Sequence, residues 1–101
     1  MPINVYLQSV DGKKEDQVFD LHNSLARVWP VGNSSFPLLQ YIDPYGNTIF
    51  NGPQMDQVRK ELSLLIEKVT TEEQKTMLRK IDEIAERCQK HPHKFLRFRG
   101  D

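Results

Sequence analysis

The segment from residue 41 to residue 54 reads Tyr41-Ile42-Asp43-Pro44-Tyr45-Gly46-Asn47-Thr48-Ile49-Phe50-Asn51-Gly52-Pro53-Gln54. It begins with a turn, because Asp43 and Pro44 suit the opening positions of a type I turn and Gly46 tolerates left-handed backbone angles. Residues 48–50 then have the β-branched and aromatic composition of a strand. Together with the apolar residues 38–42 ahead of the turn, the segment predicts a β-hairpin with a loop of four or five residues.

The end of the same segment predicts the start of a helix. Proline is favoured at the first helical position, and Pro53 stands there, followed by apolar residues at helical spacing. The threonines at residues 70–71 and Glu73 form a capping box for a second helix. This second helix is expected to end near residues 89–91, ahead of a proline. So short a link predicts that the two helices pack as an antiparallel pair.

Strands are predicted at both ends of the chain. Ile3, Val5 and Leu7 alternate with polar or amphipathic residues, which is the pattern of a half-buried strand. Residues 94–99 alternate in the same way and are numerous enough for one strand. We expect these two strands to lie side by side at the centre of the sheet.

The region after the first strand is less regular. Its polar residues 13–17 are expected to form a loop. Residues 18–29 carry apolar side chains at helical spacing, although residues 17–21 are equally compatible with a short strand. We favour a short helix over Ser24–Trp29, which Pro30 would stop.

These elements predict an α+β fold, in which a small, mostly antiparallel sheet is packed on one face by an antiparallel αα-hairpin. The sheet is expected to consist of the N-terminal strand, the central hairpin and the C-terminal strand. A chain of 101 residues has the size of one ordinary domain, so we expect a single globular domain over residues 1–101. The expected shape resembles that of small bacterial proteins, including inhibitor-like immunity proteins, at the level of the fold.

Composition excludes several classes of protein. The formal net charge is zero, so the whole molecule has no general attraction for nucleic acid or for anionic membranes. The single cysteine excludes an internal disulfide framework and suits a reducing compartment. No stretch approaches the ~20 apolar residues that a membrane span needs. We therefore expect a soluble, cytoplasmic protein that does not associate with membranes.

Metal ligands occur close together only around residue 90. Cys88, His91 and His93 are the donor types that bind zinc or copper, but a closed tetrahedral site needs a fourth ligand and no second pair is present. The alternative is that Cys88 lies in the core on the apolar stripe of its helix. We expect this alternative, and hence neither a metal nor another cofactor.

Catalytic patterns are similarly absent from the sequence. Cys88 with His22 or His91 would be the nucleophile and base of a thiol enzyme. A thiol buried among apolar residues has a raised pKa and is inert, which argues against this pair. The chain contains no nucleophile elbow, phosphate-binding loop or zinc-protease motif. We therefore expect a protein that is not an enzyme.

Binding is the function that remains, and aromatic residues are the first candidates for it. Trp29, Tyr41, Tyr45 and Phe95 are expected to be exposed, and aromatic side chains are enriched at protein interfaces. The first hypothesis is therefore a non-catalytic protein-binding module that acts by occluding a protein partner. The polar residues of the hairpin and the arginines of the last strand extend the expected site to Asn47, Asn51, Arg97 and Arg99.

The last strand also supports an alternative hypothesis. If Leu96 and Phe98 face the core, Phe95 lies between arginines on the other face of the strand. An aromatic ring beside arginines suits the stacking of a base and the binding of phosphates, as in a nucleic-acid-binding module. The competing structural interpretation is that Phe95 packs under the helices and the arginines pair with helix carboxylates.

Overall fold

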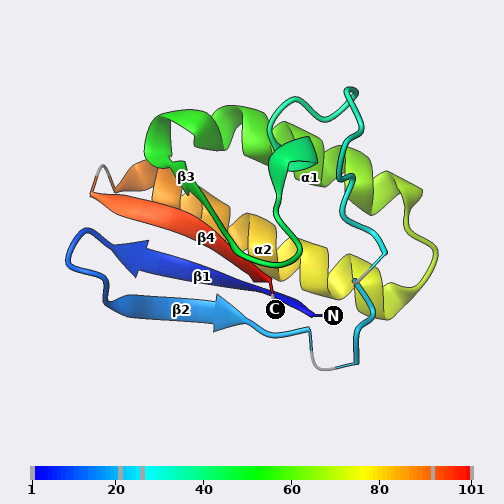
Figure 1. Cartoon of the computed structure of the whole chain (residues 1–101), viewed down its shortest axis with the longest axis horizontal. Helices are drawn as coiled ribbons and strands as arrows, with labels where there is room; N and C mark the ends of the chain where they lie inside the picture. Colours follow the sequence, from blue (N-terminus) through cyan, green and yellow to red (C-terminus); the bar gives the residue numbers. More distant parts are fainter. Residues whose placement is uncertain (1, 21, 26, 92, 101) are drawn as a thin grey trace.

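The computed structural model describes residues 2–20, 22–25, 27–91 and 93–100. In this part of the chain, four strands form one antiparallel sheet, and two helices cover one of its faces (Figure 1). The order across the sheet is β2-β1-β4-β3, with the bounds β1 Ile3–Ser9, β2 Lys14–Val18, β3 Asn47–Asn51 and β4 Lys94–Gly100. The helices are α1 Met55–Lys68 and α2 Glu72–Lys90, with short 3-10 turns η1 Leu39–Tyr41 and η2 Gly52–Gln54. The predicted α+β class is confirmed.

The two terminal strands form the centre of the sheet, as predicted. β1 pairs with β4 over the whole of both strands, with Ile3 opposite Gly100 and Tyr6 opposite Arg97. Leu96 and Phe98 of β4 are buried in the core that the helices cover. Since side chains alternate along a strand, Phe95, Arg97 and Arg99 lie on the face away from the helices.

The predicted strand at residues 38–42 is wrong. This segment contains the helical turn η1, and β3 pairs with β4 instead. The cause is Glu61 on α1, whose buried carboxylate accepts the backbone N–H of Leu38 at 3.1 Å and of Leu39 at 2.8 Å. A side chain therefore satisfies the groups that a strand neighbour would otherwise bind. The hairpin that the sheet contains is β1–β2.

The predicted loop at residues 13–17 is also wrong, because these residues belong largely to strand β2. A tight turn joins β1 to β2, in which Ser9 N–H donates to Lys13 O at 2.9 Å. β2 lies at the sheet edge, and of its side chains Val18 alone is buried. Its polar residues form ion pairs, Asp16 with Arg87 of α2 and Glu15 with Lys94 at 2.6 Å. The sequence of β2 therefore lacks the alternation of apolar and polar residues by which a strand is predicted.

The short helix predicted over Ser24–Trp29 is wrong for the residues that the structure describes there, which form turns. Position 26 lies outside the described residues, as does position 21 of the alternative strand. The turn is held by the buried Asp20, whose carboxylate accepts the N–H of Leu25 at 3.0 Å. Leu25 and Trp29 belong to the core. Their helical spacing in the sequence therefore comes from burial of both side chains and not from a helix.

Both helix starts have capping boxes. At η2, which leads into α1, Asn51 Oδ1 accepts Gln54 N–H at 3.1 Å, while Asn51 N–H donates to Gln54 Oε1 at 2.9 Å. This confirms a helical start around Pro53. At α2 the cap is Thr71 with Gln74, one residue later than the predicted box ending at Glu73. The end of α2 at Lys90 agrees with the prediction.

Candidate functional site

The helices leave one face of the sheet uncovered, which is called the open face from here on (Figure 1). α2 packs against β1, β2 and β4 on the other face, and α1 packs beside α2. Strand alternation and the pairing register decide which side chains reach the open face. They are Asn4, Tyr6, Gln8, Lys14, Gln17, Asn47, Ile49, Asn51, Phe95, Arg97 and Arg99.

The open face carries positive charge. Lys14, Arg97 and Arg99 contribute cations, and the open-face set contains no carboxylate. The nearby acids of β2 are neutralised elsewhere, because Asp16 pairs with Arg87 of α2 and Glu15 pairs with Lys94. A protein with zero formal net charge thus has one face of positive potential.

Tyr6 is the centre of a cluster of side chains on this face. Its ring lies under the ammonium of Lys14, 4.4 Å from the centroid, and beside the guanidinium of Arg97 at 5.6 Å. Phe19 contacts it edge-on with 6.0 Å between centroids. These neighbours leave Tyr6 only 5% exposed, although it points away from the core. Cation–π contacts of this kind hold the cations in place as well as covering the ring.

Arg97 is fixed by hydrogen bonds as well. Its Nε donates to Asn47 Oδ1 at 2.9 Å, and a terminal nitrogen donates to Gln8 Oε1 at 3.0 Å. The guanidinium thus bridges β1, β4 and β3. Since Arg97 is already ordered, a partner that binds here has less side-chain entropy to remove.

Five of the eight predicted site residues meet on the open face: Asn47, Asn51, Phe95, Arg97 and Arg99. Tyr41 and Tyr45 are exposed, as expected, and precede β3 in the chain. The expected exposure of Trp29 is wrong, because its side chain is only 6% exposed and packs edge-on against Phe98 with 5.3 Å between ring centroids. Contact of the others with a partner stays a prediction.

Tyr6, Lys14 and Ile49 belong to the open face but were not among the predicted site residues. Each comes from a different strand, and the pairing register alone brings them together. The alternation of Ile3, Val5 and Leu7 was the one available signal, because it places Tyr6 on the outer face.

The cysteine and histidine residues do not form a site. Cys88 is buried, its Sγ lies 3.5 Å from the carbonyl oxygen of Lys94, and burial raises the pKa of the thiol to about 11. His91 and His93 are exposed. Over the described ranges, no group of three or more histidine, cysteine or acidic residues could hold a metal ion. The expectation that the chain binds no metal stays a prediction.

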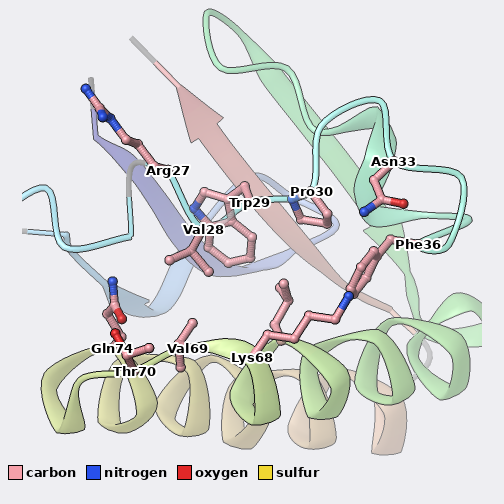
Figure 2. A pocket seen from close by; sticks show the side chains of 11 residues that line it. Arg27, Val28, Trp29, Pro30, Asn33, Phe36, Lys68, Val69, Thr70 and Gln74 are labelled. Atoms are coloured by element: carbon pink, nitrogen blue, oxygen red, sulfur yellow. The ribbon is translucent and has the colours of Figure 1, made fainter.

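A cavity of about 430 Å³ lies between the loop around residues 27–36 and the region where α1 ends (Figure 2). Trp29, Val28 and Phe36 form its apolar walls, and the Lys68 ammonium lies 5.0 Å from the Phe36 ring centroid. Figure 2 shows Arg27 extending away from the cavity. Binding pockets and catalytic sites need polar groups that converge on one point, and the side chains drawn here do not converge.

Comparisons of the chain with protein-family models, with curated proteins and with solved structures gave no match. Among the described residues, neither α1 nor α2 is long and apolar enough to cross a membrane.

Proposed function

We propose that this chain is a non-catalytic protein-binding module that binds an acidic protein partner through the open face of its sheet. The observation that carries the proposal is the composition of this face. The exposed apolar side chain of Ile49 and the half-buried ring of Phe95 lie beside the cations of Lys14, Arg97 and Arg99, without a carboxylate among them. Apolar area and a complementary charge are what a protein interface uses for affinity and for orientation.

Occlusion is the mode of action that fits such a module. The central residue Arg97 of the open face is held by hydrogen bonds to Asn47 and Gln8, and a sheet surface is suited to covering part of a partner rather than to enclosing a small molecule. Such a mode of action would be inhibitor-like or immunity-like, and this role is part of the proposal. A single cysteine without a disulfide partner suits a reducing compartment, which supports the proposal of a cytoplasmic location.

The nucleic-acid hypothesis is the second candidate, and the cluster around Tyr6 counts against it. A base needs an accessible aromatic ring face to stack on. Lys14, Arg97 and Phe19 surround the ring of Tyr6, so Phe95 is left as the one stacking position on the open face as the structure describes it. The three cations are also few for a binding mode dominated by phosphate contacts.

Affinity capture from the native host with charge-reversed variants tests the proposal. Arg99→Glu changes an exposed residue of the open face, and Arg79→Glu makes the same change at an exposed position on α2. We expect the same protein to be recovered with the wild type and with Arg79→Glu. Its recovery with Arg99→Glu should fall about tenfold, which corresponds to roughly 1.4 kcal/mol.

Two results would overturn the protein-binding proposal. The first is equal recovery with Arg99→Glu and Arg79→Glu, which would remove the open face from the interface. The second is that the captured material disappears after nuclease treatment and that binding weakens steeply with salt. That result would favour nucleic acid, because bound phosphates release counterions.

A further inference from the structure

The two edges of the sheet differ in their protection against pairing with another strand. β2 carries the charges of Lys14, Glu15 and Asp16, which is how natural proteins keep an edge from pairing. β3 consists of Asn47, Thr48, Ile49, Phe50 and Asn51, with neither a charge nor a proline. Ile49 in its middle is 53% exposed. The β3 edge is therefore the unprotected one.

The register of β3 and β4 identifies which backbone groups point away from the sheet. Gly100 N–H donates to Gly46 O at 2.7 Å, so these two residues form a hydrogen-bonded pair. Hydrogen-bonded and non-hydrogen-bonded pairs alternate in an antiparallel ladder. Thr48 and Phe50 therefore direct their backbone groups to β4, while Asn47, Ile49 and Asn51 direct theirs outward.

One hydrogen bond confirms this orientation independently. Asn51 N–H donates to Gln54 Oε1 at 2.9 Å, which lies outside the sheet. By this register the backbone N–H and C=O groups of Asn47 and Ile49 point away from β4, and neither residue has another backbone partner among the described residues; the C=O of Asn51 is the N-cap carbonyl of η2 and keeps a second lone pair. A row of outward backbone groups with an exposed apolar side chain at its middle is a template for another strand.

We propose that the β3 edge pairs with the β3 edge of a second copy of this chain, antiparallel, across a two-fold axis at Ile49. The strand is self-complementary about this residue, because Asn47 and Asn51 stand two positions to either side. In the pair, each Asn47 lies opposite an Asn51 and the two Ile49 side chains meet on the open face. A two-fold contact of one patch with itself is the commonest symmetry of protein dimers.

Most of the outward backbone groups of the two copies pair in this arrangement. The two Ile49 residues exchange two hydrogen bonds, and each Asn47 N–H donates to the Asn51 carbonyl of the other copy. The N–H of Asn51 donates to Gln54 rather than to the Asn47 carbonyl opposite it, so this carbonyl remains exposed to water. The capping box of η2 and the strand pair are therefore compatible.

The same arrangement explains why assembly stops at two copies. After β3 is paired, the edges that remain are the two β2 strands, whose charges oppose further addition. The two open faces join into one continuous surface, on which Arg97 and Arg99 each occur twice. Ile49 belongs to both the strand edge and the open face, so dimerisation is tested by the oligomeric state of variants at Ile49, and partner binding is tested by Arg99→Glu.

Sedimentation equilibrium of the purified chain tests the pairing. Ile49→Lys introduces the charge that protects natural edges, and Val31→Lys is the matched control at a loop residue that is 50% exposed. A single strand pair is a small interface, so we expect a dissociation constant on the order of 10–100 µM. The wild type and Val31→Lys should approach twice the monomer mass at high concentration, while Ile49→Lys stays at the monomer mass.

An engineered disulfide between two copies tests whether the two-fold axis of the dimer lies at residue 49. Directly opposite residues of a hydrogen-bonded pair have Cα atoms about 5.5 Å apart, within the range that a disulfide spans. Mild oxidation should therefore link Ile49→Cys into a dimer but leave Val31→Cys monomeric, since the native Cys88 is buried.

A wild type that stays monomeric up to about 0.5 mM overturns the dimer proposal and leaves the β3 edge to a strand of another protein. A dimer that Ile49→Lys does not weaken overturns it too.

Discussion

Glu61 determines the conformation of a segment more than twenty residues away. Its carboxylate is fully buried on α1, binds the N–H groups of Leu38 and Leu39, and also accepts a hydrogen bond from Gln57 at 3.0 Å. An acidic side chain with several donors around it is stable in a protein interior. This interaction closes the core with η1 and leaves β3 without a neighbour on its outer side.

Replacing Glu61 by alanine should lower the free energy of unfolding by about 2–4 kcal/mol, because two buried N–H groups lose their acceptor. Glu61→Gln keeps one acceptor oxygen and should lose less. Urea denaturation measures both, and Glu67→Ala at an exposed position of α1 is the control. A loss for Glu61→Ala no larger than that of the control would show that η1 does not depend on this carboxylate.

Cys88 provides a prediction about pH. Burial raises the pKa of its thiol from 9.0 to about 11 in the folded protein. A raised pKa means that the folded state favours the protonated thiol. The resulting stability is fully present below pH 9 and is lost as the pH rises toward about 11.

At pH 8 the thiolate of the folded protein should therefore be about a hundredfold scarcer than that of the unfolded chain. Alkylation of Cys88 should be slower by at least this factor, and urea should remove the difference. Mass spectrometry of the labelled protein measures both rates. Rapid alkylation of the folded protein at pH 8 would contradict the burial of this side chain.

At the scale of elements, the start of α2 allows a test with neighbouring residues. Thr71 caps the helix, since its hydroxyl accepts Gln74 N–H at 3.1 Å, and Thr70 lies one position outside it. Thr71→Ala should cost about 1 kcal/mol of stability, while Thr70→Ala should change it little. Thermal or urea unfolding of the two variants measures both losses of stability. Equal losses would mean that the cap does not reside at Thr71.

Elements with a strong local signal are the ones that the sequence predicts correctly. The two helices, β1 and β4 have apolar spacing or caps within their own residues, and all four are found where expected. The conformation of η1 depends on Glu61, which lies far along the chain. β2 is a polar edge strand whose partners are Arg87 and Lys94, so its own residues carry no strand pattern.

The residues of the candidate site were likewise predictable only where the signal lies within a single strand. Alternation in β4 was sufficient to place Phe95, Arg97 and Arg99 on one face, given that Leu96 and Phe98 are buried. Tyr6 and Lys14 reach this face through the pairing register, which no local pattern contains. Trp29 was expected to be exposed as one of four candidate aromatic residues, yet an aromatic residue in a turn region fills the core as readily as one of a strand.

For the whole molecule, the distribution of charge matters more than its sum. Zero formal net charge excludes a general attraction to polyanions, but it conceals a positive open face and acids that lie largely on the helices. The helices stabilise the sheet from one side, so the other side is free to bind a partner (Figure 1). Exposed charges are screened by salt, and the binding of an acidic protein should therefore weaken moderately as ionic strength rises.

The most direct measurement of binding by the open face is photo-crosslinking from single positions in the native host. A benzophenone-bearing phenylalanine analogue at Phe95 probes the open face, and the same analogue at Arg79 probes the exposed side of α2. We predict one protein adduct of discrete mass from position 95, insensitive to nuclease, and none from position 79. Protein adducts from position 79 but not from position 95, or a nuclease-sensitive adduct at position 95, would contradict protein binding by this face.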